Sequence, residues 1–269
     1  MIPLRDDQPT STFPIVTVIL IVANVLVYLV QQTVPGFNDL FSMVPYRVTH
    51  PMALGPYVAQ ITAQGVAFQH IPSGYAPTAL GRALIFVGPG YAPAWATIFT
   101  AMFMHGSLLH IGGNMLYLYI FGNNIEDALG KVRFLLFYFA CGAFAALAHI
   151  SADPNSLIPT IGASGAVAGV LGAYLILYPQ ARVLSIVPLF GLGFLAEVRA
   201  VWVLGLWIAL QLFQGFAGGG IRQGGGVAYF AHIGGFFAGL VLIYLLGGPR
   251  LVARQKQRDT FGPPPPGYY

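Results

Sequence analysis

Six long apolar stretches dominate the pattern of hydrophobic and polar positions along this chain of 269 residues. About 20 apolar residues in a helix suffice to cross the hydrocarbon core of a bilayer. The pattern therefore predicts membrane spans at 13–34, 101–122, 132–150, 161–178, 200–217 and 227–247. The fold class expected is all-α, a polytopic membrane bundle of six transmembrane helices. The first stretch has no small-residue cleavage site, so we expect it to stay as an anchor.

The composition agrees with lipid as the main solvent of this chain. Charged residues make up 7% of it and hydrophobic residues 57%, and its mean hydropathy is +0.73. A soluble domain carries about 25% charged residues, so this chain could not cover a water-facing surface. The formal net charge is +4, but the basic residues are too scattered for a nucleic-acid-binding stripe. The single cysteine, Cys141, excludes an internal disulfide framework and is expected to serve packing.

Lys and Arg are distributed unevenly over the segments that connect the spans. If the N-terminus is inside, the outer segments hold Arg47, Arg82 and Arg222. The inner segments then hold Arg5, Lys131, Arg133, Arg182, Arg199, Arg250, Arg254, Lys256 and Arg258. Because cytoplasmic loops carry an excess of Lys and Arg, both termini are predicted to be cytoplasmic.

The chain divides into three expected parts. A cytoplasmic N-terminus at 1–12 precedes a membrane domain at 13–250, which includes a long outer loop near 35–100. A Pro-rich cytoplasmic tail at 251–269 is expected to be disordered. Within the outer loop, four apolar residues recur at helical spacing: Phe37, Leu40, Phe41 and Val44. They predict a helix that either lies in the outer leaflet or packs on the bundle; the pattern does not separate the two.

Few ionisable side chains stand out within the predicted spans, and each is a functional hypothesis because burying one in lipid is unfavourable. They are His105, His110, His149 and His232, of which His149 sits at a span end, and the amide of Asn114 joins them. The second, fourth and sixth spans run in the same direction. His110, Ser164 and His232 should therefore share the outer leaflet. From the rise per residue, His232 would lie about 8 Å and His110 about 13 Å below the ends of their helices.

Ser164 stands in the segment Gly162-Ala-Ser-Gly165 at the start of the fourth predicted span. Flanking glycines allow a backbone or a substrate to come close, and a helix N-terminus offers free N–H groups. Such donors can stabilise an oxyanion. His110 and Asn114 are four residues apart, so they project from one helix face.

Two glycine pairs predict that the fourth and sixth spans touch. Gly165 and Gly169 form one small-residue face, and Gly235 and Gly239 form the other, as at close helix contacts in membranes. That contact could bring His232 to Ser164, and a serine needs a base within hydrogen-bond reach to become a nucleophile.

Each of these features alone has a simpler interpretation. A serine or a glycine at a membrane helix contact is usually structural, and a lone histidine can relay protons, bind a cofactor or bond a carbonyl. A metal site from His105, His110 and His232 lacks both a His-Glu-x-x-His motif and an intramembrane acid, so no metal or cofactor is expected. Glu126 and Asp127 are expected to cap and bond the turn before the third span.

Four segments in order, over residues 95–245, together resemble the rhomboid family of intramembrane serine proteases. They are His105–Asn114, Phe121–Gly130, Gly162–Gly165 and Ala231–Gly239. The resemblance implies a dyad without aspartate, in which Ser164 is the nucleophile and His232 the general base.

The resemblance also implies the surroundings of the dyad. The oxyanion site would consist of His110, Asn114 and the backbone N–H of Ser164, with Gly162 and Gly165 in the active-site turn. Glu126 would be a structural acid after the second span, and His105 would be structural.

The chain departs from the family pattern at two positions. Ala96 follows Trp95 where members often have arginine, which puts any role of that arginine in doubt. Ala168 stands where some members have an aromatic residue that packs on the histidine, so another group must hold His232.

The function implied is hydrolysis of peptide bonds in or near transmembrane segments of membrane proteins. The expected partners are transmembrane substrates and the lipid bilayer, and the expected location is a plasma (inner) membrane of bacterial type.

Two alternatives stay open: a rhomboid-like protein that escorts membrane helices without cutting them, and a transporter with a histidine relay. Intact Ser164, His232, His110 and Asn114 argue against the first, and the lack of partner acids within the spans argues against the second. The sequence does not give the oligomeric state.

Overall fold

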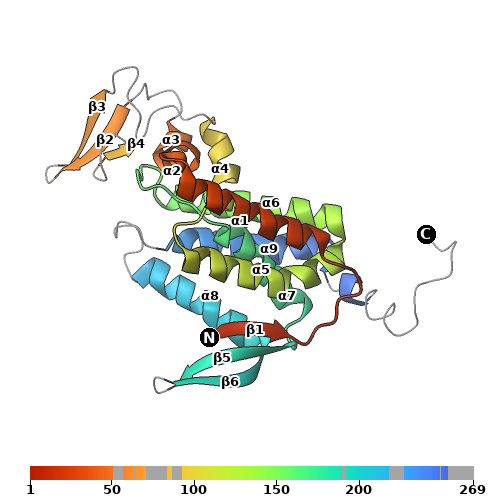
Figure 1. The fold of residues 1–269 in the computed structure, drawn as a ribbon. Helices are drawn as coiled ribbons and strands as arrows, with labels where there is room; N and C mark the ends of the chain where they lie inside the picture. Colours follow the sequence, from red (N-terminus) through yellow and green to blue (C-terminus); the bar gives the residue numbers. More distant parts are fainter. Residues whose placement is uncertain are drawn as a thin grey trace.

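The chain forms a bundle of long helices with two small sheets attached (Figure 1). The computed structural model describes residues 1–50, 57–62, 65–70, 84–86, 93–189, 192–217, 227–248 and 250–253. The long helices are α1 (Ile15–Thr33), α5 (Leu108–Leu129), α6 (Lys131–Ala152), α7 (Ser164–Leu177), α8 (Ala200–Ala217) and α9 (Tyr229–Leu245). The short helices are α2 (Phe37–Phe41), α3 (Pro45–Thr49) and α4 (Thr97–Thr100), with 3₁₀ turns η2 (Ala94–Ala96) and η3 (Ala101–Phe103).

Each of the six predicted spans overlaps one of the long helices, although α5 and α6 extend beyond the predicted bounds. By length and composition, α1 and α6 are long and apolar enough to cross a membrane, whereas the apolar helices α7, α8 and α9 are shorter. The mostly helical bundle therefore agrees with the expected fold class. The number of spans and the orientation of the termini stay predictions.

The second predicted span begins later than expected, at Leu108. Ala101–Phe103 form the turn η3, and Ser107 has an extended backbone. The Ser107 Oγ accepts a hydrogen bond from the His110 N–H at 3.1 Å. A serine in this place caps a helix by satisfying one of its free N–H groups. His110 therefore lies in the first turn of α5, and the expected depth of about 13 Å was wrong.

The centre of the bundle is α7, whose residues 165–174 are all buried. A Cβ atom built on Gly235 would lie 2.0 Å from the carbonyl oxygen of Gly165. One built on Gly239 would lie 1.9 Å from that of Gly169. Only glycine fits such distances, so the predicted contact between the two small-residue faces is confirmed. Cys141 packs against Gly169 inside this core.

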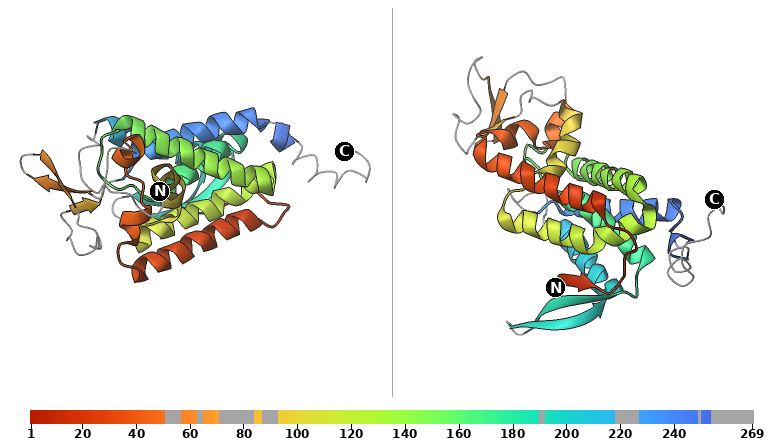
Figure 2. Two further views of the ribbon diagram at one scale, coloured as in Figure 1. Left: turned by 90° about the horizontal axis from the view of Figure 1, so that it is seen from above. Right: turned by 45° about the vertical axis from the view of Figure 1, so that its right-hand side comes forward.

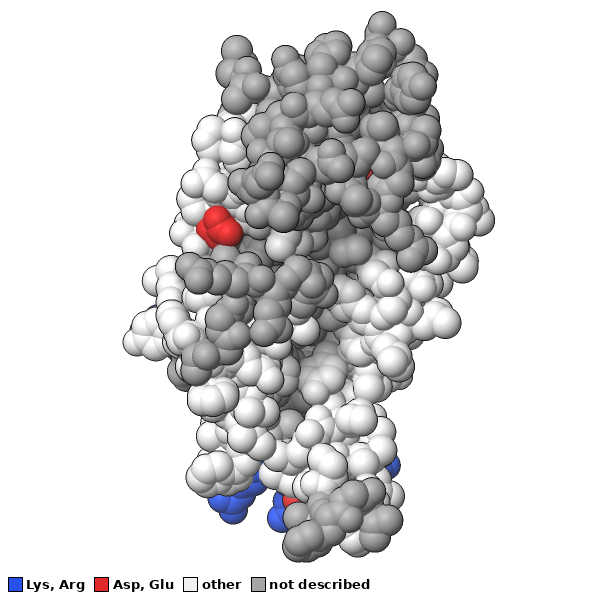
Figure 3. Space-filling model, turned by 90° about the vertical axis from the view of Figure 1, so that its left-hand side faces the viewer, with Lys and Arg blue, Asp and Glu red and all other residues white. Residues whose placement is uncertain are grey.

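Helix α1 lies along the edge of the bundle beside α5 (Figure 2, left). Large apolar side chains are exposed on several helices, among them Leu26 on α1, Leu136 on α6, Phe213 on α8 and Val241 on α9. Figure 3 shows a face on which the described surface is almost free of charge. There, Lys and Arg gather at the end that carries strands β1, β5 and β6. This surface fits helices that face lipid.

Two three-stranded sheets, which the pattern did not predict, flank the bundle. One has the order β1-β5-β6, with β1 (Ile2–Asp6), β5 (Arg182–Leu189) and β6 (Leu192–Arg199) all antiparallel. The other has the order β3-β2-β4, with β2 (Tyr57–Thr62), β3 (Gly65–His70) and β4 (Leu84–Phe86). The first sheet ties the N-terminal residues, expected only as a cytoplasmic N-terminus, to the segment between α7 and α8.

The helix predicted near the start of the outer loop ends earlier than expected. Helix α2 stops at Phe41, and the extended residues Met43 and Val44 follow it. Met43 forms two backbone hydrogen bonds with Thr160, of 3.2 and 2.7 Å, and both Met43 and Val44 are buried. Val44 thus does not share the α2 face, and the segment packs on the chain just before α7. Of the predicted tail, residues 251–253 are helical and 254–269 lie outside the described residues.

Candidate active site

A partly open cavity of about 830 Å³ lies where α5, α7 and α9 begin. We call this the Ser164 end of the bundle, and the opposite end, where α5 ends and α1 begins, the Asp127 end. The polar and aromatic side chains that matter for its chemistry are His110, Asn114, His149, Ser164, Trp207 and His232. Five of the six residues singled out from the sequence therefore line one cavity: His110, Asn114, His149, Ser164 and His232.

Ser164 and His232 form a hydrogen bond across the contact between α7 and α9. Ser164 is the first residue of α7 and His232 is the fourth of α9. The distance between Ser164 Oγ and His232 Nε2 is 2.8 Å. The glycine contacts of Gly165 with Gly235 and of Gly169 with Gly239 hold the two helices close enough for this hydrogen bond.

Gly162 forms the turn that leads into Ser164. Its φ is +132°, a value that side chains with a Cβ rarely adopt, and its N–H donates to the Ala101 carbonyl at 2.9 Å. A Cβ built on Gly162 would lie 2.8 Å from His110 Nε2 and 3.6 Å from Ser164 Oγ. Gly162 therefore leaves open the space that separates His110 from the serine.

The geometry assigns the ring proton of His110. Its Nδ1 accepts a hydrogen bond from the Gly106 N–H at 3.3 Å. A neutral imidazole has one donor and one acceptor nitrogen, so its proton is on Nε2, the atom that faces Gly162. His110 thus offers a donor toward the side of the cavity where Ser164 lies.

Asn114 contributes a second unused donor to the same cavity. The residue is only 8% exposed, and its Nδ2 has no hydrogen-bond partner among the described residues. Leaving a buried donor unpaired is unfavourable by about 1–3 kcal/mol. A donor of this kind can bind an acceptor atom of a substrate that is present only during function.

Gln211 is the residue of the site that the sequence analysis missed. Its Oε1 lies 2.7 Å from His232 Nδ1, and the side chain is buried. Trp207, from the same helix, packs on the His232 ring with 5.7 Å between centroids. The signal was present in the sequence, because Gln211 is an amide in an apolar stretch, the criterion that singled out Asn114.

Neither of the remaining two histidines forms a hydrogen bond with Ser164 or His232 in the described part of the chain. His105 is 1% exposed, and its ring meets the His110 ring edge-on, with centroids 5.0 Å apart. Neither of its ring nitrogens has a partner within the described part of the chain. His149 lines the cavity from the end of α6 and bonds Thr160 Oγ1 through Nε2 at 3.0 Å. Among the described residues, no group of three or more His, Cys, Asp or Glu is placed to hold a metal ion.

At the Asp127 end, Glu126 binds the start of α1 rather than the turn before α6. Its carboxylate accepts hydrogen bonds from the N–H groups of Val16, at 3.0 Å, and Thr17, at 2.8 Å. The Thr17 hydroxyl donates a third, also at 2.8 Å. The first N–H groups of a helix have no partner within it, and Glu126 supplies one. The expected local role in the turn was therefore wrong.

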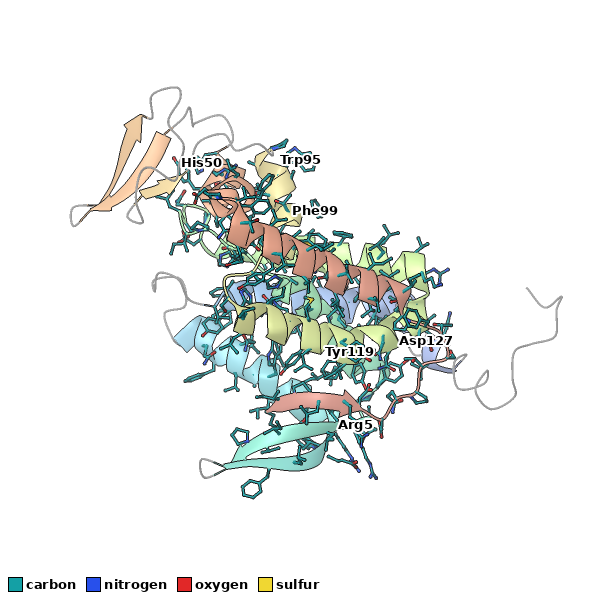
Figure 4. All side chains as sticks on the ribbon, in the orientation of Figure 1. Arg5, His50, Trp95, Phe99, Tyr119 and Asp127 are labelled. Carbon is teal, nitrogen blue, oxygen red and sulfur yellow. The ribbon has the colours of Figure 1, made fainter. Side chains whose placement is uncertain are left out.

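Asp127 likewise reaches a segment far away in sequence. It accepts hydrogen bonds from the Ser11 N–H and hydroxyl and from the Thr12 hydroxyl, at 2.6–3.2 Å. Figure 4 shows the Asp127 side chain beside the segment that leads from β1 into α1. Glu126 and Asp127 together tie the residues around the start of α1 to the end of α5.

Asp6, the last residue of β1, adds a third carboxyl group at this end. Its Oδ2 accepts from the Tyr174 hydroxyl at 2.5 Å and from Asn124 Nδ2 at 2.8 Å. Burial raises the pKa of Asp6 from 3.8 to about 6, against the lowering effect of these hydrogen bonds. The carboxyl group thus links the N-terminal strand to the ends of α5 and α7.

Comparisons with known proteins place these residues in a wider context. The family model described as Rhomboid domain matches residues 92–249. The chain is 27% identical over 232 residues to Rhomboid protein 1, mitochondrial, of Saccharomyces cerevisiae, covering 83% of this chain and 62% of that protein. It is 30% identical over 169 residues to Rhomboid-like protein 11, chloroplastic, of Arabidopsis thaliana, covering 57% and 53%.

A bacterial relative is also similar. The chain is 31% identical over 163 residues to Rhomboid protease GluP of Bacillus subtilis, covering 61% of this chain and 28% of that protein. The chain thus spans less than two thirds of the length of each of these three relatives. The matched family segment contains Ser164, His232, His110 and Asn114.

Proposed function

The chain belongs to the rhomboid family, and from this premise we propose that it is an intramembrane serine protease. Its reaction is the hydrolysis of peptide bonds in or near transmembrane segments of membrane proteins. The observation that carries the proposal is the 2.8 Å hydrogen bond between Ser164 Oγ and His232 Nε2 in a cavity with unused donors. The bacterial relative named a rhomboid protease supports the same reaction.

In the first half of the reaction, His232 Nε2 takes the proton of the Ser164 hydroxyl. Ser164 Oγ then attacks the carbonyl carbon of the scissile peptide bond. The negative charge moves to the carbonyl oxygen, where His110 Nε2–H, Asn114 Nδ2–H and the Ser164 backbone N–H donate hydrogen bonds. The tetrahedral intermediate collapses as His232 gives its proton to the leaving amine, and an acyl-enzyme remains.

In the second half, water takes the place of the departed amine. His232 removes one proton from the water, and the hydroxide attacks the acyl carbon. The same donors hold the second oxyanion, and the proton returns to Ser164 Oγ as the new carboxyl group leaves. Because water is a reactant, the site must be wet, which the volume and openness of the cavity at the Ser164 end allow.

The substrate class follows from the backbone chemistry of membrane helices. A spanning helix hides its carbonyl groups in hydrogen bonds, so it must unwind locally to reach Ser164. Substrates with Gly or Pro in their spans meet this requirement most easily, because these two residues have the lowest helix propensities. We place the enzyme in a bacterial-type plasma membrane with both termini cytoplasmic, and its partners are transmembrane proteins and the bilayer.

A fluorophosphonate probe, which reacts with activated serines, tests the proposal. The purified wild type should be labelled, and Ser164→Ala and His232→Ala should not. In liposomes, the wild type should also cut a reconstituted transmembrane substrate. A folded wild type that neither reacts with the probe nor cuts any of a panel of substrates would indicate a protein that escorts membrane helices without cutting them.

A further inference from the structure

The orientation of His232 is a requirement that the serine contact alone does not meet. To accept a proton from Ser164, Nε2 must carry a lone pair, so the proton of the neutral ring must be on Nδ1. A ring without a second partner can change tautomer or flip about its χ2 bond, and either change removes the base. A group that fixes Nδ1 is therefore needed.

Gln211 is placed to do this. Its Oε1 lies 2.7 Å from His232 Nδ1, and the side chain is only 9% exposed. A carbonyl oxygen can only accept a hydrogen bond, so the contact requires the proton on Nδ1 and leaves the lone pair on Nε2 for Ser164. With the amide turned over, its NH₂ group would instead select the opposite tautomer, which cannot take the serine proton.

Helix α8 presents a second contact to the same ring. Trp207 and Gln211 are four residues apart and so lie on one helix face. The Trp207 and His232 rings are tilted by 34° with centroids 5.7 Å apart. Ring packing by Trp207 limits the tilt of the imidazole, and the hydrogen bond to Gln211 limits its rotation. This pair on α8 occupies the role that Ala168, with its small side chain, cannot fill.

We propose that Gln211 is a positioning residue that holds His232 in the tautomer and orientation needed to activate Ser164. The inference rests on the proposed protease function and extends it from two residues to an ordered chain, Gln211 to His232 to Ser164. The amide carries no charge, so it orients the imidazole without adding a negative charge beside it. Its loss should therefore slow the chemical step and leave substrate binding unchanged.

Two substitutions at this position separate the hydrogen bond from packing. Gln211→Met keeps a side chain of similar length but has no oxygen, and Gln211→Glu keeps an acceptor oxygen. Gln214, exposed on the same helix, provides the matched control Gln214→Met. Turnover, KM and the rate of fluorophosphonate labelling are measured on the full chain in liposomes, with the thermal midpoint as a check of folding.

Gln211→Met should lower turnover and labelling rate by about 10-fold or more, since losing the group that orients a catalytic histidine is severe. KM should stay within about twofold. Gln211→Glu should recover much of the loss, and Gln214→Met should match the wild type. In ¹⁵N spectra of histidine-labelled protein, the His232 signals should report Nδ1–H in the wild type and a tautomer mixture in Gln211→Met.

Two results would overturn the proposal. One is labelling of Gln211→Met at the wild-type rate. The other is an equal loss in Gln211→Met and Gln211→Glu, with a lowered thermal midpoint and an unchanged tautomer, because that result indicates packing alone. If the proposed protease function itself were wrong, the wild type and Gln214→Met would stay unlabelled as well, which distinguishes the two failures.

Discussion

The two ends of the bundle treat their buried polar groups in opposite ways. At the Asp127 end, the Glu126 carboxylate accepts three hydrogen bonds and Asp6 accepts two. At the Ser164 end, Asn114 Nδ2 has no partner among the described residues, and His110 Nε2 faces the space beside Gly162. The carboxylates at the Asp127 end hold chain segments together, whereas the donors of His110 and Asn114 at the Ser164 end are left for a substrate.

This difference separates groups that serve the fold from groups that serve chemistry. A satisfied buried network stabilises one arrangement, so Glu126 and Asp6 have little left to offer a ligand. An unused buried donor opposes stability and is retained where a transient partner uses it. His105 limits the rule, because its ring nitrogens also have no partner within the described residues, yet it does not line the cavity. An unused donor indicates chemistry only where a substrate can reach it.

The largest effect expected is the loss of the serine. Ser164→Ala should abolish cleavage, since the attacking atom is gone, and should leave the thermal midpoint nearly unchanged. His232→Ala should be equally inactive, and the double variant should be no worse, because residues that act as one unit are strongly non-additive. Cleavage of a transmembrane substrate in liposomes is the measurement. Losses that multiply in the double variant would show that the two residues act separately.

Removal of the side-chain donor of Asn114 or His110 should have the next largest effect. Asn114→Ala and His110→Ala should each lower turnover by about 10²–10³, the typical contribution of one oxyanion donor. His110→Ala should lose more, because the ring also shapes the cavity. KM should change little, since the oxyanion forms only in the transition state. A raised KM at unchanged turnover would reassign these residues to substrate binding.

The contact that joins Ser164 to His232 should be sensitive to a single side chain. In Gly239→Leu, the new Cβ would meet the Gly169 carbonyl oxygen, so α7 and α9 must separate. Overpacking of this kind typically destabilises by about 1–3 kcal/mol, and the thermal midpoint in detergent should fall. Gly205→Leu on α8 is the matched control, because nothing lies within 4 Å of a Cβ built there. Equal midpoints for the two variants would show that this contact tolerates separation.

The sequence pattern predicted the parts of the site that depend on local periodicity. The glycine spacing on the fourth and sixth spans indicated their contact, and the four-residue spacing of His110 and Asn114 indicated one face. The later start of α5 was missed because residues 101–107 are largely apolar, while a single cap at Ser107 decides where the helix begins. Hydropathy does not detect such a cap.

Features that join distant segments were not predictable from one sequence. β1 pairs with β5 although about 180 residues separate them, and no local pattern specifies that register. The partners of Glu126 are similarly remote, near position 16. Gln211 is different, because it is an amide within an apolar stretch and thus meets the criterion that singled out Asn114.

The smallest effect expected lies at the Asp127 end and depends on pH. Burial raises the pKa of Asp6 in the folded protein to about 6, above the ordinary value of 3.8. Between these two values the folded state binds more protons than the unfolded state, so stability falls as the pH rises from about 4 to 6 and is then constant as far as this group is concerned. Asp6→Asn cannot ionise, so its thermal midpoint should lose this part of the pH dependence, while turnover at neutral pH stays near that of the wild type because Asp6 is remote from Ser164.

Thermal midpoints of both proteins at pH 4, 5, 6 and 7 are compared, and their difference removes the contribution of all other groups. A difference that does not change between pH 4 and 6 would show that Asp6 is not held in a buried, proton-binding environment. A loss of turnover in Asp6→Asn would show that the two ends do not work independently.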